Sequence, residues 1–200
     1  MNPEFKRATD EPVFWDERYR TGKTPWDFGT IPEGLRNFLV QEKERGRVLI
    51  PGCGSGYEVE AFCRAGWDVL GVDFSEAAVT RARKLLGQYS SCVIQANFFD
   101  PAVISNSYDV IYECTFLCAL PPQRWQSCVQ RILELLRPSG RWLGFFFYGQ
   151  EADSPPYPLS PEWAKKLLSG NFRAIEDLPV RDSLPLFAGR ERWQIWQRAA

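Results

Sequence analysis

Three glycines, Gly52, Gly54 and Gly56, follow an apolar run at residues 47–50 and precede a helical pattern. Glycine lets the backbone adopt positive φ angles and pass close to a ligand, and the start of a helix offers free N–H groups. The spacing is G-x-G-x-G, whereas dinucleotide-binding proteins have G-x-G-x-x-G. The glycines are therefore candidate cofactor-binding residues, although a tight turn without a ligand explains them equally well.

Polar groups also follow the next two apolar runs. Asp73 ends the second run, and a carboxylate at this place can accept hydrogen bonds from both hydroxyls of a ribose. Asn97 and Phe98 follow the third run, where an amide can read the edge of an adenine and a ring can pack on its face. Taken alone, Asp73 could instead lie near a helix N-terminus, and Asn97 could belong to a turn.

The chain contains no histidine. This excludes Ser-His-Asp and Cys-His catalysis and metal sites with histidine ligands. None of the six cysteines forms a C-x-x-C pair, since the closest two, Cys114 and Cys118, have three residues between them. We predict no metal site and interpret the cysteines as small apolar side chains in the core.

Strand and helix patterns alternate from residue 35 onward. Apolar runs predict strands at residues 47–50, 67–72, 91–95, 108–113, 142–148, 172–177 and 192–198. Helical spacing predicts helices at residues 35–46, 58–65, 75–87, 125–136 and 161–169. This order predicts an α/β fold with a doubly wound, mostly parallel seven-stranded sheet and helices on both faces. Such sheets bind ligands at the carboxyl ends of their strands, where the polar signals fall.

The first 34 residues differ from the rest, because they lack clean periodicity and are rich in aromatic side chains. Five of these surround a Gly-Lys-Thr-Pro turn: Phe14, Trp15, Tyr19, Trp26 and Phe28. We interpret residues 1–34 as a lid and residues 35–200 as one domain. Aromatic residues near an N-terminus can also be a strap of core, which is the simpler alternative.

The charge is balanced, with 24 basic and 25 acidic residues and a net charge of -1. A protein that binds nucleic acid through phosphates would be strongly basic, so this class of partner is not expected. No apolar run approaches the roughly 20 residues of a membrane helix, and the N-terminus lacks the apolar stretch of a leader peptide. We expect a cytoplasmic monomer with reduced thiols that binds no membrane.

Together, the signals at the ends of strands one to three resemble the class I S-adenosylmethionine-dependent methyltransferases. The sequences FWDERY at residues 14–19 and GKTPWD at 22–27 resemble the lid of the thiopurine S-methyltransferase and halide/thiol methyltransferase family. The sequence FLCALPP at residues 116–122 and the segment 155–157 are similar to that family too, and FLCALPP resembles the halide/thiol branch more.

The resemblance implies S-adenosylmethionine as methyl donor and no metal. The candidate cofactor-binding residues are then Trp15, Tyr19, Trp26, Gly52, Gly54, Gly56, Asp73, Phe74, Ser75, Asn97, Phe98, Glu113 and Cys114. The expected acceptor pocket consists of Trp15, Trp26, Phe28, Arg124, Tyr148 and Tyr157.

Methyl transfer requires a nucleophile held about 3–3.5 Å from the methyl carbon. A thiolate or halide needs no general base, which suits a chain without histidine, and a dry aromatic pocket would strip water from the anion. We therefore predict a small soft nucleophile as the acceptor. Glu113 is the rival explanation, as a general base for a neutral acceptor. Two other classes stay open: a catalytically silent methyltransferase-like binding module and an NAD-dependent oxidoreductase.

Overall fold

A computed structural model of the chain describes residues 9, 11–102, 104, 107–150, 152–187 and 189–199. Seven strands form one sheet in the order β3-β2-β1-β4-β5-β7-β6. Their bounds are β1 Arg47–Pro51, β2 Asp68–Asp73, β3 Val93–Gln95, β4 Tyr108–Cys114, β5 Leu136–Phe147, β6 Phe172–Pro179 and β7 Glu191–Arg198. Strands β1 to β5 are parallel, and β7 runs antiparallel to both β5 and β6. This confirms the predicted doubly wound, mostly parallel sheet.

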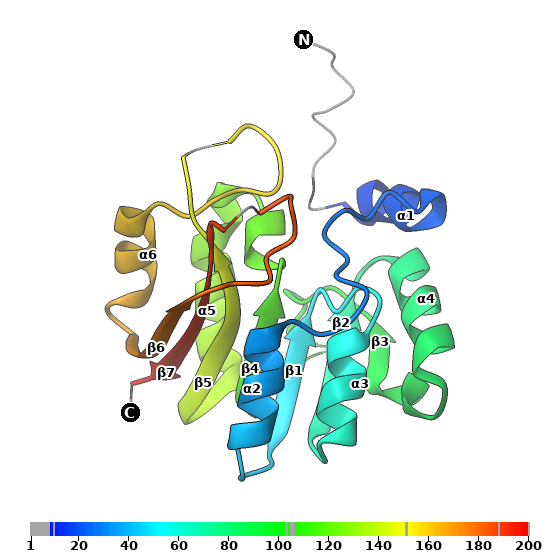
Figure 1. Ribbon diagram of the computed structural model, residues 1–200, viewed down its shortest axis with the longest axis horizontal. Helices are drawn as coiled ribbons and strands as arrows, with labels where there is room; N and C mark the ends of the chain where they lie inside the picture. Colours follow the sequence, from blue (N-terminus) through cyan, green and yellow to red (C-terminus); the bar gives the residue numbers. More distant parts are fainter. Residues whose placement is uncertain are drawn as a thin grey trace.

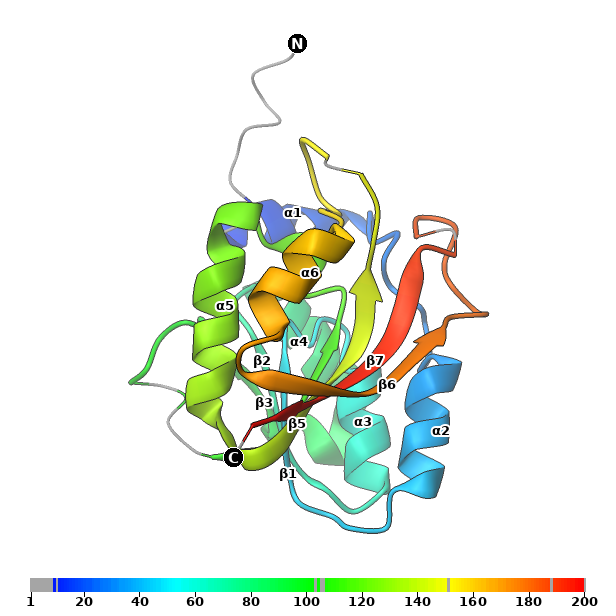
Figure 2. The ribbon, with the colours of Figure 1, turned by 90° about the vertical axis from the view of Figure 1, so that its left-hand side faces the viewer.

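Helices cover both faces of the sheet (Figures 1 and 2). Helices α2 (Glu33–Gln41), α3 (Tyr57–Arg64) and α4 (Glu76–Leu86) lie on one face, and α5 (Pro122–Leu135) and α6 (Pro161–Leu168) lie on the other. Each helix buries an apolar stripe, such as Phe62 of α3 on one face and Ile132 of α5 on the other. Burial of these stripes drives the packing that fixes the strand ends.

The fifth strand begins earlier than its sequence predicts. Helix α5 ends at Leu135, and β5 starts at Leu136 and ends at Phe147 instead of spanning residues 142–148. Leu136 pairs with Tyr108 of β4, and its carbonyl accepts a hydrogen bond from Arg198. A shift of register after Tyr108 accommodates the added residues. The Pro-Ser-Gly sequence at 138–140 follows the helix end, as predicted, but it also lies within the bounds of β5, where Ser139 has a φ angle of +63°.

Within the predicted lid, residues 12–21 form a helix that no periodic pattern indicated, α1 (Pro12–Thr21). It packs against α4, beyond the carboxyl ends of the parallel strands (Figure 1). Asp16 is the one residue of α1 that is buried, so the helix has no apolar stripe for a pattern search to find. Residues 1–8 and 10 of the predicted lid lie outside the described residues.

None of the helices in the described part of the chain combines the length and the apolar character needed to cross a membrane.

Candidate functional site

The glycine turn follows β1 and has no room for a side chain at Gly52 or Gly54. Gly52 and Gly54 have φ angles of +60° and +50°. A Cβ atom on Gly52 would lie 2.7 Å from the ring of Phe116, and one on Gly54 would lie 2.5 Å from the Tyr19 hydroxyl. Both the backbone angles and the close approaches therefore require glycine. Gly56 then precedes α3 as its N-cap.

Asp73 ends β2 beside this turn. Its Oδ2 atom accepts a hydrogen bond from the Gly54 N–H (3.0 Å), and its Oδ1 atom accepts one from the Ser75 N–H (2.9 Å). Burial raises the pKa of Asp73 to about 6, although these two hydrogen bonds act to lower it. Each carboxylate oxygen keeps a second lone pair, so Asp73 can still accept hydrogen bonds from a ligand.

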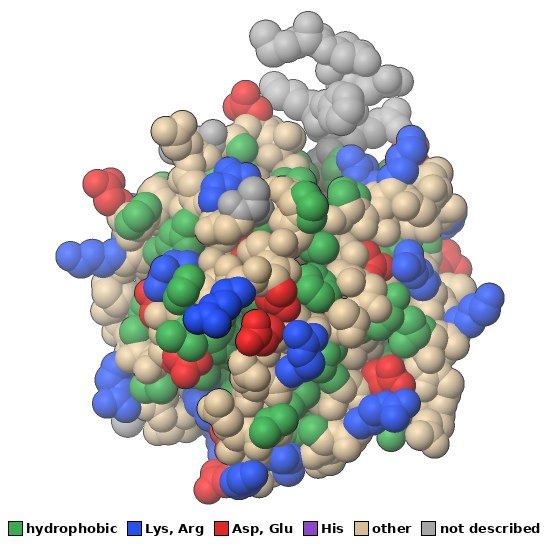
Figure 3. All heavy atoms as spheres, in the orientation of Figure 1, with side chains coloured by type: hydrophobic (Ala, Val, Ile, Leu, Met, Phe, Trp, Pro, Cys, Tyr) green, Lys and Arg blue, Asp and Glu red, His purple; other side chains and the backbone are tan. Residues whose placement is uncertain are grey.

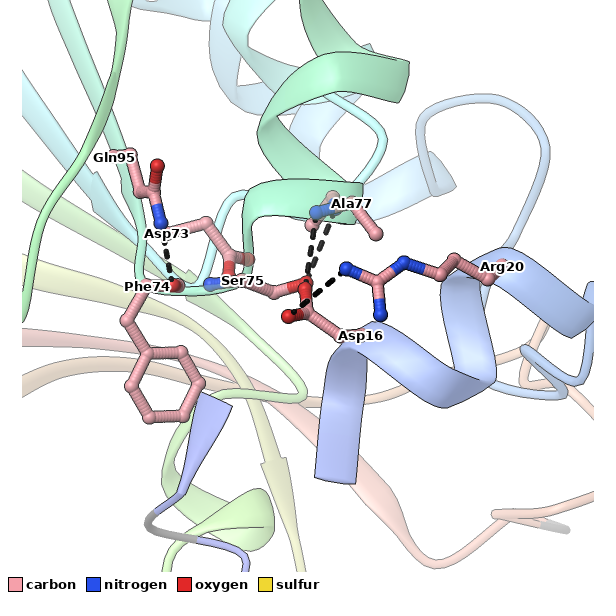
Figure 4. Close-up of polar contacts among 8 residues, drawn as sticks. Asp16, Arg20, Asp73, Phe74, Ser75, Ala77 and Gln95 are labelled. Carbon is pink, nitrogen blue, oxygen red and sulfur yellow. Dashed lines mark hydrogen bonds and ion pairs between the residues drawn. The ribbon is translucent and has the colours of Figure 1, made fainter. Parts of the chain in front are cut away.

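Asp16 connects α1 to the start of α4 (Figure 4). Its Oδ1 atom accepts hydrogen bonds from the Ser75 hydroxyl (2.6 Å) and the Ala77 N–H (3.0 Å), and Arg20 pairs with Oδ2 at 3.5 Å. Burial acts to raise the pKa of Asp16, but the hydrogen bonds from Ser75 and Ala77 hold it below its ordinary value. Asp16 was not among the predicted site residues, and the one sign of it in the sequence is its place within FWDERY.

Asp27 makes a second connection between the N-terminal segment and the glycine turn. It pairs with Arg81 of α4 at 2.9 Å and accepts a hydrogen bond from the Ser55 hydroxyl at 2.6 Å. The neighbouring Trp26 donates to the Tyr19 hydroxyl (3.5 Å) and stands edge-on to Trp15, with 5.2 Å between ring centres. The aromatic segment is thus fixed over the glycine turn by the buried Asp16 and the partly buried Asp27.

A hollow of about 440 Å³, counting space open to solvent, lies over the ends of β1, β2 and β3, and we call it the larger hollow. Its lining residues are Gly52, Val72, Asp73, Phe74, Ala96, Asn97, Phe98, Phe99, Phe116, Leu120 and Arg124. It joins a carboxylate, an amide and several rings, which is a surface suited to a ribose and a flat base. The Arg124 guanidinium lies 4.2 Å from the centre of the Phe99 ring.

A second hollow of about 280 Å³, again counting open space, lies over the ends of β4 and β5, and we call it the smaller hollow. It is lined by Trp26, Phe28, Pro32, Cys114, Thr115, Phe145, Val180, Asp182, Leu184, Phe187 and Glu191. Consecutive residues separate the two spaces, since Thr115 lines the smaller hollow and Phe116 lines the larger one. The two hollows therefore meet the chain at neighbouring residues.

Two buried glutamates near these hollows differ in what they face. The Oε2 atom of Glu113 accepts hydrogen bonds from the N–H groups of Phe116 (3.1 Å) and Leu117 (3.2 Å), so this side chain caps the loop between the hollows. Burial raises the pKa of Glu113 to about 8, but Glu113 lines neither hollow. Glu191, which sequence analysis did not single out, lines the smaller one.

The structure divides nine of the predicted site residues between the two hollows. The larger hollow receives Gly52, Asp73, Phe74, Asn97 and Phe98, together with Arg124, which we had placed with the acceptor. The smaller hollow receives Trp26, Phe28 and Cys114. Ser75 is fully buried as the N-cap of α4.

Three predicted acceptor residues, Trp15, Tyr148 and Tyr157, line neither hollow. The Tyr148 hydroxyl is hydrogen-bonded to Gln194 (3.0 Å), and the Tyr157 N–H donates to the Cys118 carbonyl (2.7 Å). Within the described residues, no group of three or more cysteine, aspartate or glutamate side chains is placed to hold a metal ion.

Two plant methyltransferases are similar to this chain in sequence. The chain is similar to a probable thiol methyltransferase 2 of Arabidopsis thaliana, with 31% identity over 93% of this chain and 85% of that protein. It is also similar to thiocyanate methyltransferase 1 of the same plant, with 26% identity over 97% and 88% of the two chains.

Among solved structures, Burkholderia thailandensis 1,6-didemethyltoxoflavin-N1-methyltransferase, with bound 1,6-didemethyltoxoflavin and S-adenosylhomocysteine, has the same fold. Its TM-score is 0.75 at 17% identity, over 94% of this chain and 87% of that one. The family model for thiopurine S-methyltransferase matches residues 10–199. The chain therefore belongs to the thiopurine S-methyltransferase family.

Proposed function

We propose that this protein transfers a methyl group from S-adenosylmethionine to a small soft nucleophile, such as a thiol or a halide, and releases S-adenosylhomocysteine. The observation that carries the proposal is the pair of adjacent hollows, one with polar groups and rings and one mainly apolar, separated by the chain at Thr115 and Phe116. The names of the relatives, a thiol and a thiocyanate methyltransferase, support the class of acceptor.

The larger hollow fits the adenosine part of this cofactor. Asp73 would accept hydrogen bonds from the ribose hydroxyls, and Asn97 with Phe98 would contact the adenine. Gly52 would lie against the methionine part, because it lines the same hollow and carries no side chain. When bound, S-adenosylmethionine supplies a methyl group on a sulfonium cation.

The smaller hollow would hold the acceptor. Rings from Trp26, Phe28 and Phe187 line it and would exclude water from the reacting atoms. An aromatic face also attracts a cation such as sulfonium. Residues 11–34 would act as a lid, because Trp26 belongs both to this wall and to the segment that Asp16 and Asp27 fix over the glycine turn.

We also propose that the protein is a cytoplasmic monomer that binds neither nucleic acid nor membranes. The balanced charge supports this, and cationic and anionic side chains are interspersed on the face seen in Figure 3. All six cysteines are free thiols, as expected in a reducing compartment.

The test measures S-adenosylhomocysteine release with hydrosulfide, aryl thiols, thiocyanate, iodide, thiopurines and selenium or tellurium oxyanions. Calorimetry with S-adenosylmethionine and with NADH runs in parallel. We expect S-adenosylmethionine to bind and thiols or halides to be methylated. Binding of S-adenosylmethionine without release for any acceptor would indicate a silent binding module, and preferential binding of NADH would indicate an oxidoreductase.

A further inference from the structure

Glu191 is a buried carboxylic acid at the smaller hollow. It begins β7, pairs with Phe147 of β5 and is 7% exposed. It lines the hollow together with Cys114 and Thr115. Among the described residues, no lysine or arginine forms an ion pair with it. The neighbouring Ser183 hydroxyl acts to lower the pKa of Glu191, but no described cation offsets its charge, and burying such a charge is costly.

The titratable side chains around the smaller hollow are acidic. No described cationic side chain lines it, and its other carboxylate, Asp182, is balanced by Arg36 (3.7 Å) and by the Glu33 N–H (2.7 Å). All the described titratable groups that interact electrostatically with Glu191 are acids: Asp182, Glu113, Cys114 and Cys118. Burial, together with the charge of Asp182, raises the pKa of Glu191 above its ordinary value.

These surroundings discriminate between acceptors by charge. An iodide or thiocyanate ion in the smaller hollow would be repelled by an ionised Glu191. Its attraction would come from the sulfonium of the cofactor, since no described cationic side chain lines the hollow. A neutral thiol would bring no charge into the hollow, and its S–H group could donate to the carboxylate. The geometry therefore favours an acceptor that arrives with its proton.

We propose that Glu191 selects a neutral thiol as the acceptor and accepts its proton during methyl transfer, an inference that rests on the proposed function. Glu191 takes the S–H proton while the thiol sulfur bonds to the methyl carbon. The bond between that carbon and the sulfonium breaks, and its electron pair stays on the sulfur of S-adenosylhomocysteine. Glu191 then releases the proton to solvent. Glu113 cannot take this role, because its carboxylate caps the loop and lines neither hollow.

The experiment compares 2-mercaptoethanol, iodide and thiocyanate as acceptors at pH 7. For Glu191→Gln we expect kcat/KM for the thiol to fall about 100-fold or more, the range that a general base contributes. Turnover of iodide and thiocyanate should rise, because the repelling charge is gone. Affinity for S-adenosylmethionine, measured by calorimetry, should not change. The matched control is Glu162→Gln, an exposed glutamate in the first turn of α6, which should behave as the wild type.

The pH profile of the wild type gives a second readout that needs no variant to fold. As the pH falls through the pKa of Glu191, thiol turnover should fall and iodide turnover should rise, since protonation removes both the base and the repelling charge. In Glu191→Gln, iodide turnover should not follow this titration. Its thiol defect should shrink above about pH 8.5, where an alkyl thiol ionises by itself.

The contrary results separate this inference from the proposed function. A thiol-to-iodide ratio that neither Glu191→Gln nor pH alters would overturn the role of Glu191 and leave methyl transfer intact. Wild-type protein that binds S-adenosylmethionine but methylates none of the three acceptors would overturn both the inference and the acceptor class. Protein that does not bind S-adenosylmethionine at all would overturn the proposed function itself.

Discussion

At the scale of single residues, Asp73 is the side chain on which cofactor binding should depend most. Asp73→Asn removes the charge and keeps one acceptor oxygen, so it retains the hydrogen bond from the Gly54 N–H or the Ser75 N–H but not both. We expect S-adenosylmethionine affinity to fall about ten- to a hundredfold, since hydrogen bonds to a charged group contribute about 1.5–3 kcal/mol. Calorimetry measures this. Asp68→Asn, at the exposed far end of β2, is the control and should bind normally.

The same residue predicts how binding depends on pH. The pKa of Asp73 is raised to about 6, so the carboxylate that would hold the ribose is lost as the pH falls through that value. Affinity for S-adenosylmethionine should therefore weaken below about pH 6 in the wild type and stay flat in Asp73→Asn. A wild-type profile without this decline argues against a ribose contact by the ionised Asp73.

Glu113 should be structural, which separates it from Glu191. Glu113→Ala leaves two buried N–H groups without an acceptor, and we expect unfolding to become easier by about 1–3 kcal/mol. Glu113→Gln retains an acceptor oxygen for Phe116 and Leu117 and should keep most of the stability and thiol turnover. Urea denaturation together with thiol kinetics tests both variants. Stable Glu113→Gln protein without thiol turnover would restore Glu113 as the base.

At the scale of elements, α1 is fixed to the domain by polar groups and hardly by apolar packing. Asp16→Ala removes the acceptor for the Ser75 hydroxyl and the Ala77 N–H, so α1 should open more often. Hydrogen exchange of residues 12–21 should become about tenfold faster or more, given charge-assisted hydrogen bonds of about 1.5–3 kcal/mol. The neighbouring Glu17→Ala is the control, because Glu17 is exposed.

Exchange of the same segment also tests whether it acts as a lid. Residues 15–28 should exchange more slowly when S-adenosylhomocysteine is bound, because a lid opens to admit and release ligands. Equal exchange with and without the ligand would mean that the segment is a permanent strap.

The elements also show why parts of the structure could be predicted from sequence. The strands that end at the site are short, buried and apolar, so their runs of residues reveal them. Helix α1 escaped because its buried residue is an aspartate, and the start of β5 was misplaced because proline, serine and glycine at 138–140 are typical of a helix end. Glu191 could not be assigned to the site from the sequence, because it comes near the end of β4 only through the antiparallel pairing of β7 with β5.

At the scale of the whole molecule, buried acids should make stability depend on pH. Glu113 has its pKa raised to about 8 from an ordinary value of 4.5, and Asp73 has its pKa raised to about 6 from 3.8. Between the ordinary pKa and the raised pKa of each group, the folded protein holds a proton that the unfolded chain has lost. The folded state is therefore favoured at low pH, and this contribution disappears as the pH rises through 6 and then 8.

The free energy of unfolding of the ligand-free protein, measured by urea denaturation, should accordingly be higher at pH 5 than at pH 8, by a few kcal/mol in total. The comparison stops at about pH 5, because Asp16 and Glu42 have lowered pKa values and begin to lose their stabilising effect below it. The double variant with Asp73→Asn and Glu113→Gln should reduce the slope. An unfolding free energy that rises from pH 5 to pH 8 would contradict the assignment.

The position of Trp26 has a consequence for the order of events in turnover. This ring lines the smaller hollow, yet it belongs to the segment that covers the glycine turn. S-adenosylmethionine must reach the glycine turn before residues 11–34 close over it. The smaller hollow, which would hold the acceptor, is complete only after this closure. Initial-rate kinetics should therefore show a compulsory sequence in which the donor enters first and its demethylated product leaves last. S-adenosylhomocysteine should then inhibit competitively against the donor and noncompetitively against the acceptor.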